Sequence, residues 1–172
     1  HLVVGSFNEA SPVPGRCYNT SVVLGPDGAV LATYRKLHLF DVDVSDEVRF
    51  RESDTVVPGD AVVTVNTALG CLGLSICYDL RFPELYAALV QRGAEIVLIP
   101  SAFTLATGKD HWEPLVRARA IETQAFVLAP GQHGRHDDGG LRHSWGHSMI
   151  VDPWGHVIAQ ASDGPGVALS AL

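Results

Sequence analysis

Cys77 has the sequence setting of a nucleophilic thiol. A short apolar run, residues 72–76, predicts a buried strand that ends at this cysteine. Pro83 and Glu84 follow, and both residue types favour the first turn of a helix. A thiol at a strand-to-helix turn is pushed out of the sheet and lies near helix N–H groups, which favour the reactive thiolate. The spacing therefore predicts a nucleophile; the alternative is a small buried hydrophobe, which most free cysteines are.

Two charged residues precede this stretch, and their types alone do not assign them a function. Lys36 follows the apolar segment 29–34, where a lysine most often is a solvated charge on an edge strand. Glu52 lies in the charged segment 47–54, whose default place is a wet surface. A catalytic role for either residue therefore depends on the family resemblance described below.

Three further residues are candidates for substrate binding. Arg81 can clamp a substrate carboxylate, because a guanidinium binds a carboxylate through two parallel hydrogen bonds. The alternative is a structural ion pair of Arg81 with Asp79, Glu84 or another acid. Phe103 and Thr104 follow the end of an apolar strand, and strand ends commonly carry the sites of open α/β sheets.

The eight histidines include two pairs with metal-ligand spacing, His133 with His136 and His143 with His147. Their loop is rich in glycine, has no nearby cysteine and has no helix to align an i, i+4 pair. We therefore expect no metal and no cofactor. Arg117 and Arg119 are expected to be a helix-surface or buried salt-bridge pair.

The elements that must position these residues are mostly strands. The strands are expected at 2–7, 18–24, 29–34, 62–65, 71–76, 96–99, 126–129, 147–151 and 156–159. Helices are expected at 83–92 and at 110–124, the second opening with a capping-box pattern. The segments 41–59 and 131–144 lack a clear period and are expected to be loops. Fully apolar strands imply sheets covered on both faces, which predicts an α/β layered fold.

The length, composition and net charge of the chain limit the class of protein to which it can belong. The chain has 172 residues, 47% hydrophobic and 18% charged, as expected for one soluble globular domain. A net charge of −7 without a basic run argues against nucleic acid, and no apolar stretch approaches the ~20 residues that span a bilayer. The odd number of cysteines without a C-x-x-C motif indicates a reducing compartment, so the cytoplasm, or else the mitochondrion, is expected. A start at His1 within a strand, and an end within an apolar run, suggest a piece of a longer chain.

Several motifs together resemble the nitrilase, or carbon–nitrogen hydrolase, superfamily in order and spacing. The resemblance covers essentially the whole chain and rests on Tyr34-Arg-Lys-Leu-His-Leu39, Arg51-Glu-Ser53 before Pro58-Gly59, Cys77-Tyr-Asp-Leu-Arg-Phe-Pro-Glu84, Pro100–Phe103, His111-Trp112, Arg117–Gln124, Gly146–Ser148 and Asp152–Gly155. Within the superfamily the chain is most similar to the deaminated glutathione amidases and next to the ω-amidases. The resemblance implies an αββα four-layer sandwich, with residues 1–172 forming one partial carbon–nitrogen hydrolase domain.

The resemblance also implies a Glu–Lys–Cys triad. The cysteine carries over onto Cys77, the lysine onto Lys36, and a second, supporting glutamate onto Glu52. The family's general-base glutamate lies in a Leu-Pro-Glu-type motif upstream of a segment like Leu2–Phe7, and this sequence has no such motif. Glu9 follows the wrong strand for that role and is not assigned to it.

The implied reaction begins with attack of the Cys77 thiolate on an amide carbon, which forms a thioester. A carboxylate takes the thiol proton and later activates water. The Lys36 ammonium and the backbone N–H of Tyr78 would stabilise the negative charge on the former carbonyl oxygen. Tyr78, Arg81, Phe103 and Thr104 are the expected substrate-binding residues.

The expected function is hydrolysis of the terminal amide of a small carboxylate-bearing substrate, deaminated glutathione, to acid and ammonia. One alternative is an ω-amidase acting on 2-oxoglutaramate or 2-oxosuccinamate. A second is a catalytically incomplete fragment or pseudoenzyme that acts through assembly. A third is a papain-like Cys–His hydrolase using His111 or His147, in which Lys36 would have no role. The helices at 83–92 and 110–124 are expected to form interfaces of a homodimer or larger homo-oligomer.

Overall fold

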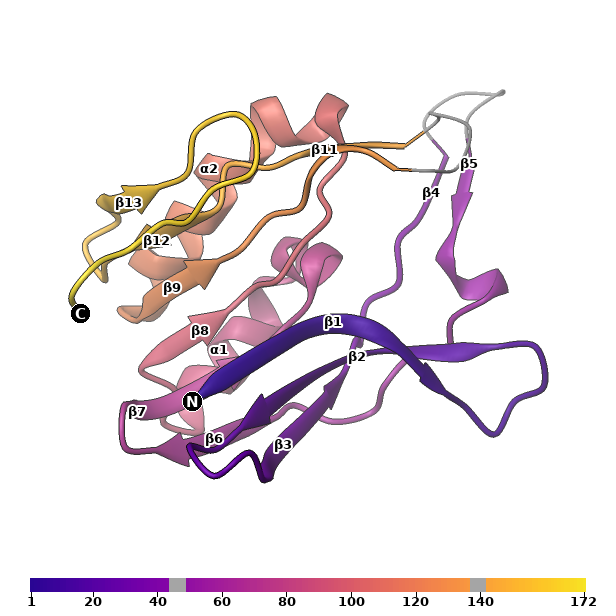
Figure 1. Cartoon of the computed structure of the whole chain (residues 1–172), viewed down its shortest axis with the longest axis horizontal. Helices are drawn as coiled ribbons and strands as arrows, with labels where there is room; N and C mark the ends of the chain where they lie inside the picture. Colours follow the sequence, from indigo (N-terminus) through magenta and orange to yellow (C-terminus); the bar gives the residue numbers. More distant parts are fainter. Residues whose placement is uncertain (44–48, 137–141) are drawn as a thin grey trace.

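The computed structural model describes residues 1–43, 49–136 and 142–172, which form two main sheets and two α-helices (Figure 1). The larger sheet has six strands in the order β13-β12-β9-β8-β7-β6. Its strands are β6 (Thr64–Thr67), β7 (Gly70–Leu74), β8 (Ile96–Leu98), β9 (Phe126–Ala129), β12 (Met149–Val151) and β13 (Val157–Gln160). The central strands β7, β8 and β9 are parallel, and the outer strands pair with them antiparallel.

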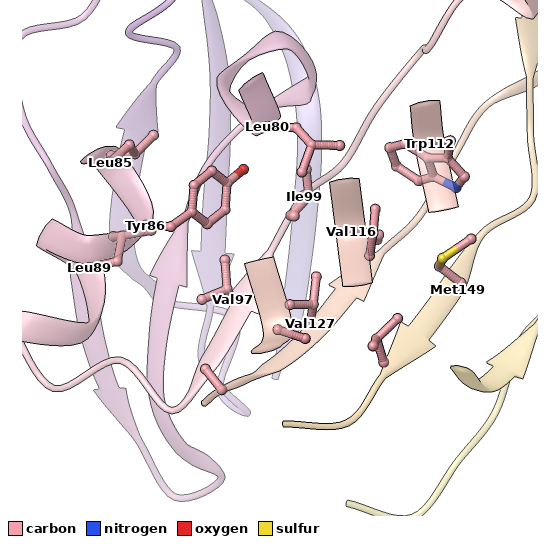
Figure 2. Close-up of a cluster of buried hydrophobic side chains, with 14 of the residues drawn as sticks. Leu80, Leu85, Tyr86, Leu89, Val97, Ile99, Trp112, Val116, Val127 and Met149 are labelled. Atoms are coloured by element: carbon pink, nitrogen blue, oxygen red, sulfur yellow. The ribbon is translucent and has the colours of Figure 1, made fainter. Parts of the chain in front are cut away.

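Helices α1 (Pro83–Gln91) and α2 (Leu105–Thr123) make the crossovers between the parallel strands and cover one face of this sheet. Val97, Ile99 and Val127 point into this helical side, and Figure 2 shows them in one cluster with Tyr86 of α1 and Trp112 of α2. Each fully buried aliphatic side chain contributes ~1.5–3 kcal/mol to folding, so this cluster is a main source of stability.

The second sheet is antiparallel and consists of β1 (Leu2–Ala10), β2 (Cys17–Leu24) and β3 (Val30–Arg35), in that order. It packs against the other face of the six-stranded sheet, where Val23 and Tyr34 meet Leu74, Ile96 and Leu98. Residues 96 and 98 therefore face the second sheet while 97 and 99 face the helices, which is why these strands read as continuous apolar runs.

Two segments that were expected to be loops contain short antiparallel hairpins. The segment 41–59 holds β4 (Asp41–Asp43), β5 (Arg49–Arg51) and the 3₁₀ turn η1 (Glu52–Asp54). The segment 131–144 holds β10 (His133–Arg135) and most of β11 (His143–Trp145). Strands of three residues are too short to show a clear period in the sequence, so the prediction of plain loops was wrong here. Residues 44–48 and 137–141 lie outside the described part.

The start of α2 was also predicted wrongly. The helix begins at Leu105 instead of Asp110, because Thr104 is its N-cap and accepts a hydrogen bond from the Thr107 N–H at 3.5 Å. Pro114 consequently lies inside the helix and not in its first turn. The other helix agrees with the prediction, with a left-handed Gly93 (φ +90°) following its C-terminus.

These layers confirm the α/β sandwich, in which helices cover a sheet that packs on a second sheet. A further helical layer over β1–β3 is not found among residues 1–43, 49–136 and 142–172. Within the same residues, no helix is both long and apolar enough to cross a membrane.

Candidate active site

Cys77 lies at a sharp turn between the six-stranded sheet and α1. Strand β7 ends at Leu74, and a 3₁₀ turn, η2 (Cys77–Arg81), separates the thiol from the helix that begins at Pro83. The cysteine has a left-handed backbone (φ +49°), which is strained for a residue with a Cβ, and its N–H donates to the Pro100 carbonyl at 3.0 Å. The expected strand-to-helix turn is therefore present, but the element that starts at the thiol is η2.

The pKa of the Cys77 thiol is raised above its ordinary value, chiefly because the sulfur is shielded from water. The Lys36 ammonium acts in the opposite direction and favours the thiolate, but it does not outweigh burial. The expectation of a thiol with a lowered pKa is therefore wrong. Deprotonation of this thiol requires a base.

Lys36 is buried, with 2% of its surface exposed, so it is not a solvated edge charge. It directly follows β3, and its Nζ donates to Oε2 of Glu52 at 2.5 Å. The same carboxylate accepts from the Phe40 N–H at 2.6 Å and, through Oε1, from the Asn19 amide at 3.2 Å. Glu52 thus accepts three hydrogen bonds, one of them from the lysine, and it lies in η1 and not on a wet surface.

One cavity of about 750 Å³ joins all the predicted site residues. It is bordered by Lys36, Glu52, Cys77, Tyr78, Arg81, Phe103 and Thr104. The structure therefore brings together residues from β3, η1, η2 and the N-terminus of α2, which are far apart in the sequence. Their roles in chemistry stay predictions.

Arg81 is half-buried at the edge of this cavity. Its Nη2 lies 3.2 Å from Nδ1 of His111, and its guanidinium lies 5.5 Å from the centre of the Phe103 ring. Among the described residues no carboxylate forms an ion pair with it, and the predicted alternative partner Asp79 is bonded elsewhere. The arrangement leaves this cation facing the cavity.

Asp79 was missed as a site residue by the sequence analysis. This fully buried carboxylate accepts four hydrogen bonds, from His38, Tyr34 and Ile76. The ring of His38 stacks on Phe82, with 3.7 Å between ring centres. A signal existed, because His38 and Asp79 both belong to the family motifs, but their pairing is a long-range contact that spacing does not reveal.

The histidines do not converge on a metal centre in the described residues, where no group of three or more His, Cys, Asp or Glu side chains has ligand geometry. His136 Nε2 lies 2.7 Å from Ser144 Oγ, and His147 Nε2 lies 3.2 Å from Asp163. Of the residues considered for a Cys–His hydrolase, neither His111 nor His147 borders the cavity of Cys77.

The remaining candidates have structural surroundings. Arg117 pairs with Glu113 at the helix surface, and the buried Arg119 pairs with Glu122 and donates to the Leu80 carbonyl, as expected of a surface or buried pair. Cys17 borders the cavity, whereas Cys71 is buried on β7; all three cysteines are free. Glu9 is bound by Arg35 and Thr20 and does not border the cavity.

The chain is similar in sequence to curated deaminated glutathione amidases. A deaminated glutathione amidase from Bos taurus is 52% identical over 175 residues, covering 99% of this chain and 53% of that protein. One from Synechocystis is 49% identical over 160 residues, covering 92% and 58%. The chain thus spans about half the length of the curated relatives it matches.

Solved structures agree in fold. The NitFhit protein of C. elegans aligns with a TM-score of 0.87 and 47% identity, covering 94% of this chain and 39% of that one. Saccharomyces cerevisiae Nit3, a member of branch 10 of the nitrilase superfamily, gives 0.82 and 36%, covering 95% and 56%. An amidase from Nesterenkonia sp. AN1, solved with the acetamide moiety of fluoroacetamide on its active-site cysteine, gives 0.78 and 29%, covering 95% and 59%. The carbon-nitrogen hydrolase family model matches residues 1–172, and the chain belongs to that family.

Proposed function

We propose that this chain carries the nucleophile and the ammonium of an amidase, within a single carbon–nitrogen hydrolase domain. The observation that carries the proposal is the shared cavity, where a thiol on a strained turn faces a buried Lys36–Glu52 pair. A buried lysine held by a carboxylate, next to a free cysteine, is a costly arrangement for packing alone. It fits acyl transfer through a cysteine.

The reaction begins with removal of the Cys77 proton, because burial keeps the thiol protonated. The thiolate then attacks the amide carbon, the C–N bond breaks, and ammonia leaves with the proton that the base received. Water attacks the thioester and releases the acid and the free thiol. Glu52, whose oxygens are bonded to Lys36, Phe40 and Asn19, holds the lysine. The proton acceptor is the family's Leu-Pro-Glu glutamate, a motif that residues 1–172 do not contain.

Negative charge develops on the former carbonyl oxygen in both steps. Lys36 Nζ and the Tyr78 backbone N–H are the donors that we assign to this oxygen. Such donors act strongly because the site is shielded from water, and loss of one typically costs ~2.7–4 kcal/mol of barrier. The Lys36–Glu52 bond keeps the ammonium in place before the charge develops.

The proposed substrate is deaminated glutathione, the substrate in the names of the two amidase relatives. The cavity volume of about 750 Å³ is in the range of sites for small-molecule ligands, ~300–1,000 Å³, so it accommodates this molecule. Arg81 would bind a substrate carboxylate. Side-by-side kinetics on the two substrates test the choice, since a tenfold preference for 2-oxoglutaramate would favour the ω-amidase alternative.

The function is tested by ammonia release from the full chain and its Cys77→Ala variant. We expect turnover to fall to background, since the thioester cannot form. Cys71→Ala is the matched control, because Cys71 is buried on β7 away from the cavity, and it should retain turnover. Full turnover by the Cys77→Ala variant would disprove the nucleophile, and no turnover on any amide by the full-length protein that includes the Leu-Pro-Glu glutamate would favour the pseudoenzyme.

A further inference from the structure

A single buried carboxylate, that of Asp79, connects the two halves of the proposed site. Its Oδ1 accepts from the His38 backbone N–H at 3.0 Å and lies 2.7 Å from His38 Nδ1. Its Oδ2 accepts from the Tyr34 hydroxyl at 2.6 Å and from the Ile76 N–H at 2.9 Å. Both oxygens are therefore saturated by donors from two distant parts of the chain.

On one side these bonds enclose Lys36. Tyr34 lies two residues before the lysine and His38 two residues after it, so both flanks are tied to one carboxylate. The Tyr34 hydroxyl also accepts from the Leu37 N–H at 3.3 Å, which adds a bond inside this loop. The backbone on both sides of Lys36 is thus fixed by hydrogen bonds to Asp79.

On the other side the bonds hold the turn of Cys77. Ile76 directly precedes the cysteine and donates its N–H to Asp79, while the Asp79 N–H donates back to the Ile76 carbonyl at 3.1 Å. A left-handed non-glycine residue is strained and persists only where its surroundings fix it. This reciprocal pair is placed to fix Cys77.

We propose that Asp79 is a positioning residue that sets the placement of Lys36 relative to Cys77. The proposal deepens the proposed function and rests on it for its catalytic meaning. Asp79 does not touch substrate, because it is fully buried and does not border the cavity. An asparagine of the same shape cannot replace it, because its NH₂ group would face one of the donors that the carboxylate now accepts.

The test is a double-mutant cycle on the reaction of Cys77 with iodoacetamide, followed by mass spectrometry across pH. The charged groups that act on this thiol are Lys36, Glu52 and Asp79. In the parent chain, Lys36→Gln should raise the measured pKa of the thiol, because the favourable cation is lost. In the Asp79→Asn background the same change should have a much smaller effect, because the backbone around the ammonium is no longer fixed relative to the turn of the thiol. An equal Lys36→Gln effect in both backgrounds would overturn the proposal.

Turnover gives a second readout. If the parent releases ammonia, Asp79→Asn should lower kcat by ~100-fold while KM changes little, the pattern of a displaced catalytic group. Asp152→Asn is the matched control, since Asp152 also accepts backbone N–H bonds but lies in the turn before β13. It should leave kcat unchanged. A rise in KM with an unchanged kcat would contradict the proposal.

Should Asp79→Asn fail to fold, Tyr34→Phe carries the same cycle, because it removes one donor and keeps the buried ring. It should weaken the coupling between Lys36 and the thiol without abolishing it, and unchanged coupling would count against Asp79. Absence of turnover in the full-length protein, which supplies the Leu-Pro-Glu glutamate, would reject the amidase function, whereas the alkylation cycle would still decide the positioning role.

Discussion

At the scale of single residues, the proposed site consists of charges whose environments differ. Lys36 is buried and paired with Glu52, whereas Arg81 faces the cavity without a carboxylate partner among the described residues. A cation that already has a partner is suited to a fixed task. A cation without one can bind an anionic ligand. Substitution of Arg81 should therefore change the preference for substrates that carry a carboxylate.

Arg81→Gln should raise KM for a carboxylate-bearing amide by ~10–100-fold, since a charge-assisted hydrogen bond contributes ~1.5–3 kcal/mol. KM for a neutral amide such as butyramide should change little, because that substrate offers no carboxylate. Steady-state kinetics on both amides measure the difference. Arg117→Gln, which alters the outer surface of α2, is the control. Equal losses on both amides would assign Arg81 to packing instead of recognition.

At the scale of elements, hydrogen bonds between polar side chains link neighbouring strands. Glu9 on β1 accepts from Arg35 on β3 at 2.6 and 2.9 Å and from Thr20 on β2 at 2.7 Å, so one carboxylate joins all three strands of the smaller sheet. These bonds lower the pKa of Glu9 to about 2, with Arg35 as the main cause. Glu9 thus stabilises the smaller sheet.

Glu9→Gln should lower the free energy of unfolding by ~1 kcal/mol or less at neutral pH, because the pair is partly exposed. A depressed pKa in the folded state means that the advantage of the parent is present above the ordinary value of 4.5 and is lost as pH falls toward about 2. Denaturant titrations at several pH values measure this. Glu113→Gln, which removes an exposed helical pair, should cost less. A difference that persists at pH 2 would contradict the assignment.

The sequence predicted elements with strong local signals and failed where distant contacts decide. The β2–β3 hairpin was predicted because Gly25 to Gly28 form a turn between two apolar runs, and α1 because Pro83 and Gly93 mark its ends. The start of α2 was misplaced because Thr104 caps the helix before the polar pattern at Asp110 begins. A cap depends on geometry that several sequence patterns can satisfy.

The same limit applies to the site. The nucleophile Cys77 could be proposed from its sequence setting. The burial of Lys36, however, depends on its pair with Glu52, and the positions of the Lys36 and Cys77 segments depend on Asp79. Neither the raised pKa of Cys77 nor the three hydrogen bonds of Glu52 have a local sequence signal, because both arise from packing of β3, η1 and η2.

At the scale of the whole molecule, α1 and α2 lie on the outside of the six-stranded sheet, and their outer faces are open to association. Ile121 on α2 is 52% exposed. A single exposed apolar side chain is common on protein surfaces, so Ile121 serves here as the position at which the expected helix contact is tested. We retain the proposal of a homo-oligomer built through these helices.

Light scattering should give a mass at least twice that of one chain, and Ile121→Lys should shift the population toward monomer, because a charge is costly in an apolar contact. Val30→Lys is the matched control, since Val30 is 62% exposed on β3 and lies away from the helices. A parent chain that stays monomeric at all concentrations would rule out the association, and an equal shift in both variants would place it elsewhere.

The placement of Lys36 after β3 and of Cys77 after β7 has a consequence for stability. The two groups belong to different layers of the sandwich, so a small sliding of one layer over the other separates them before either layer unfolds. Low concentrations of denaturant should therefore abolish turnover while the circular dichroism signal of the strands is unchanged. A ligand that binds both layers should raise the denaturant concentration at which the two groups separate.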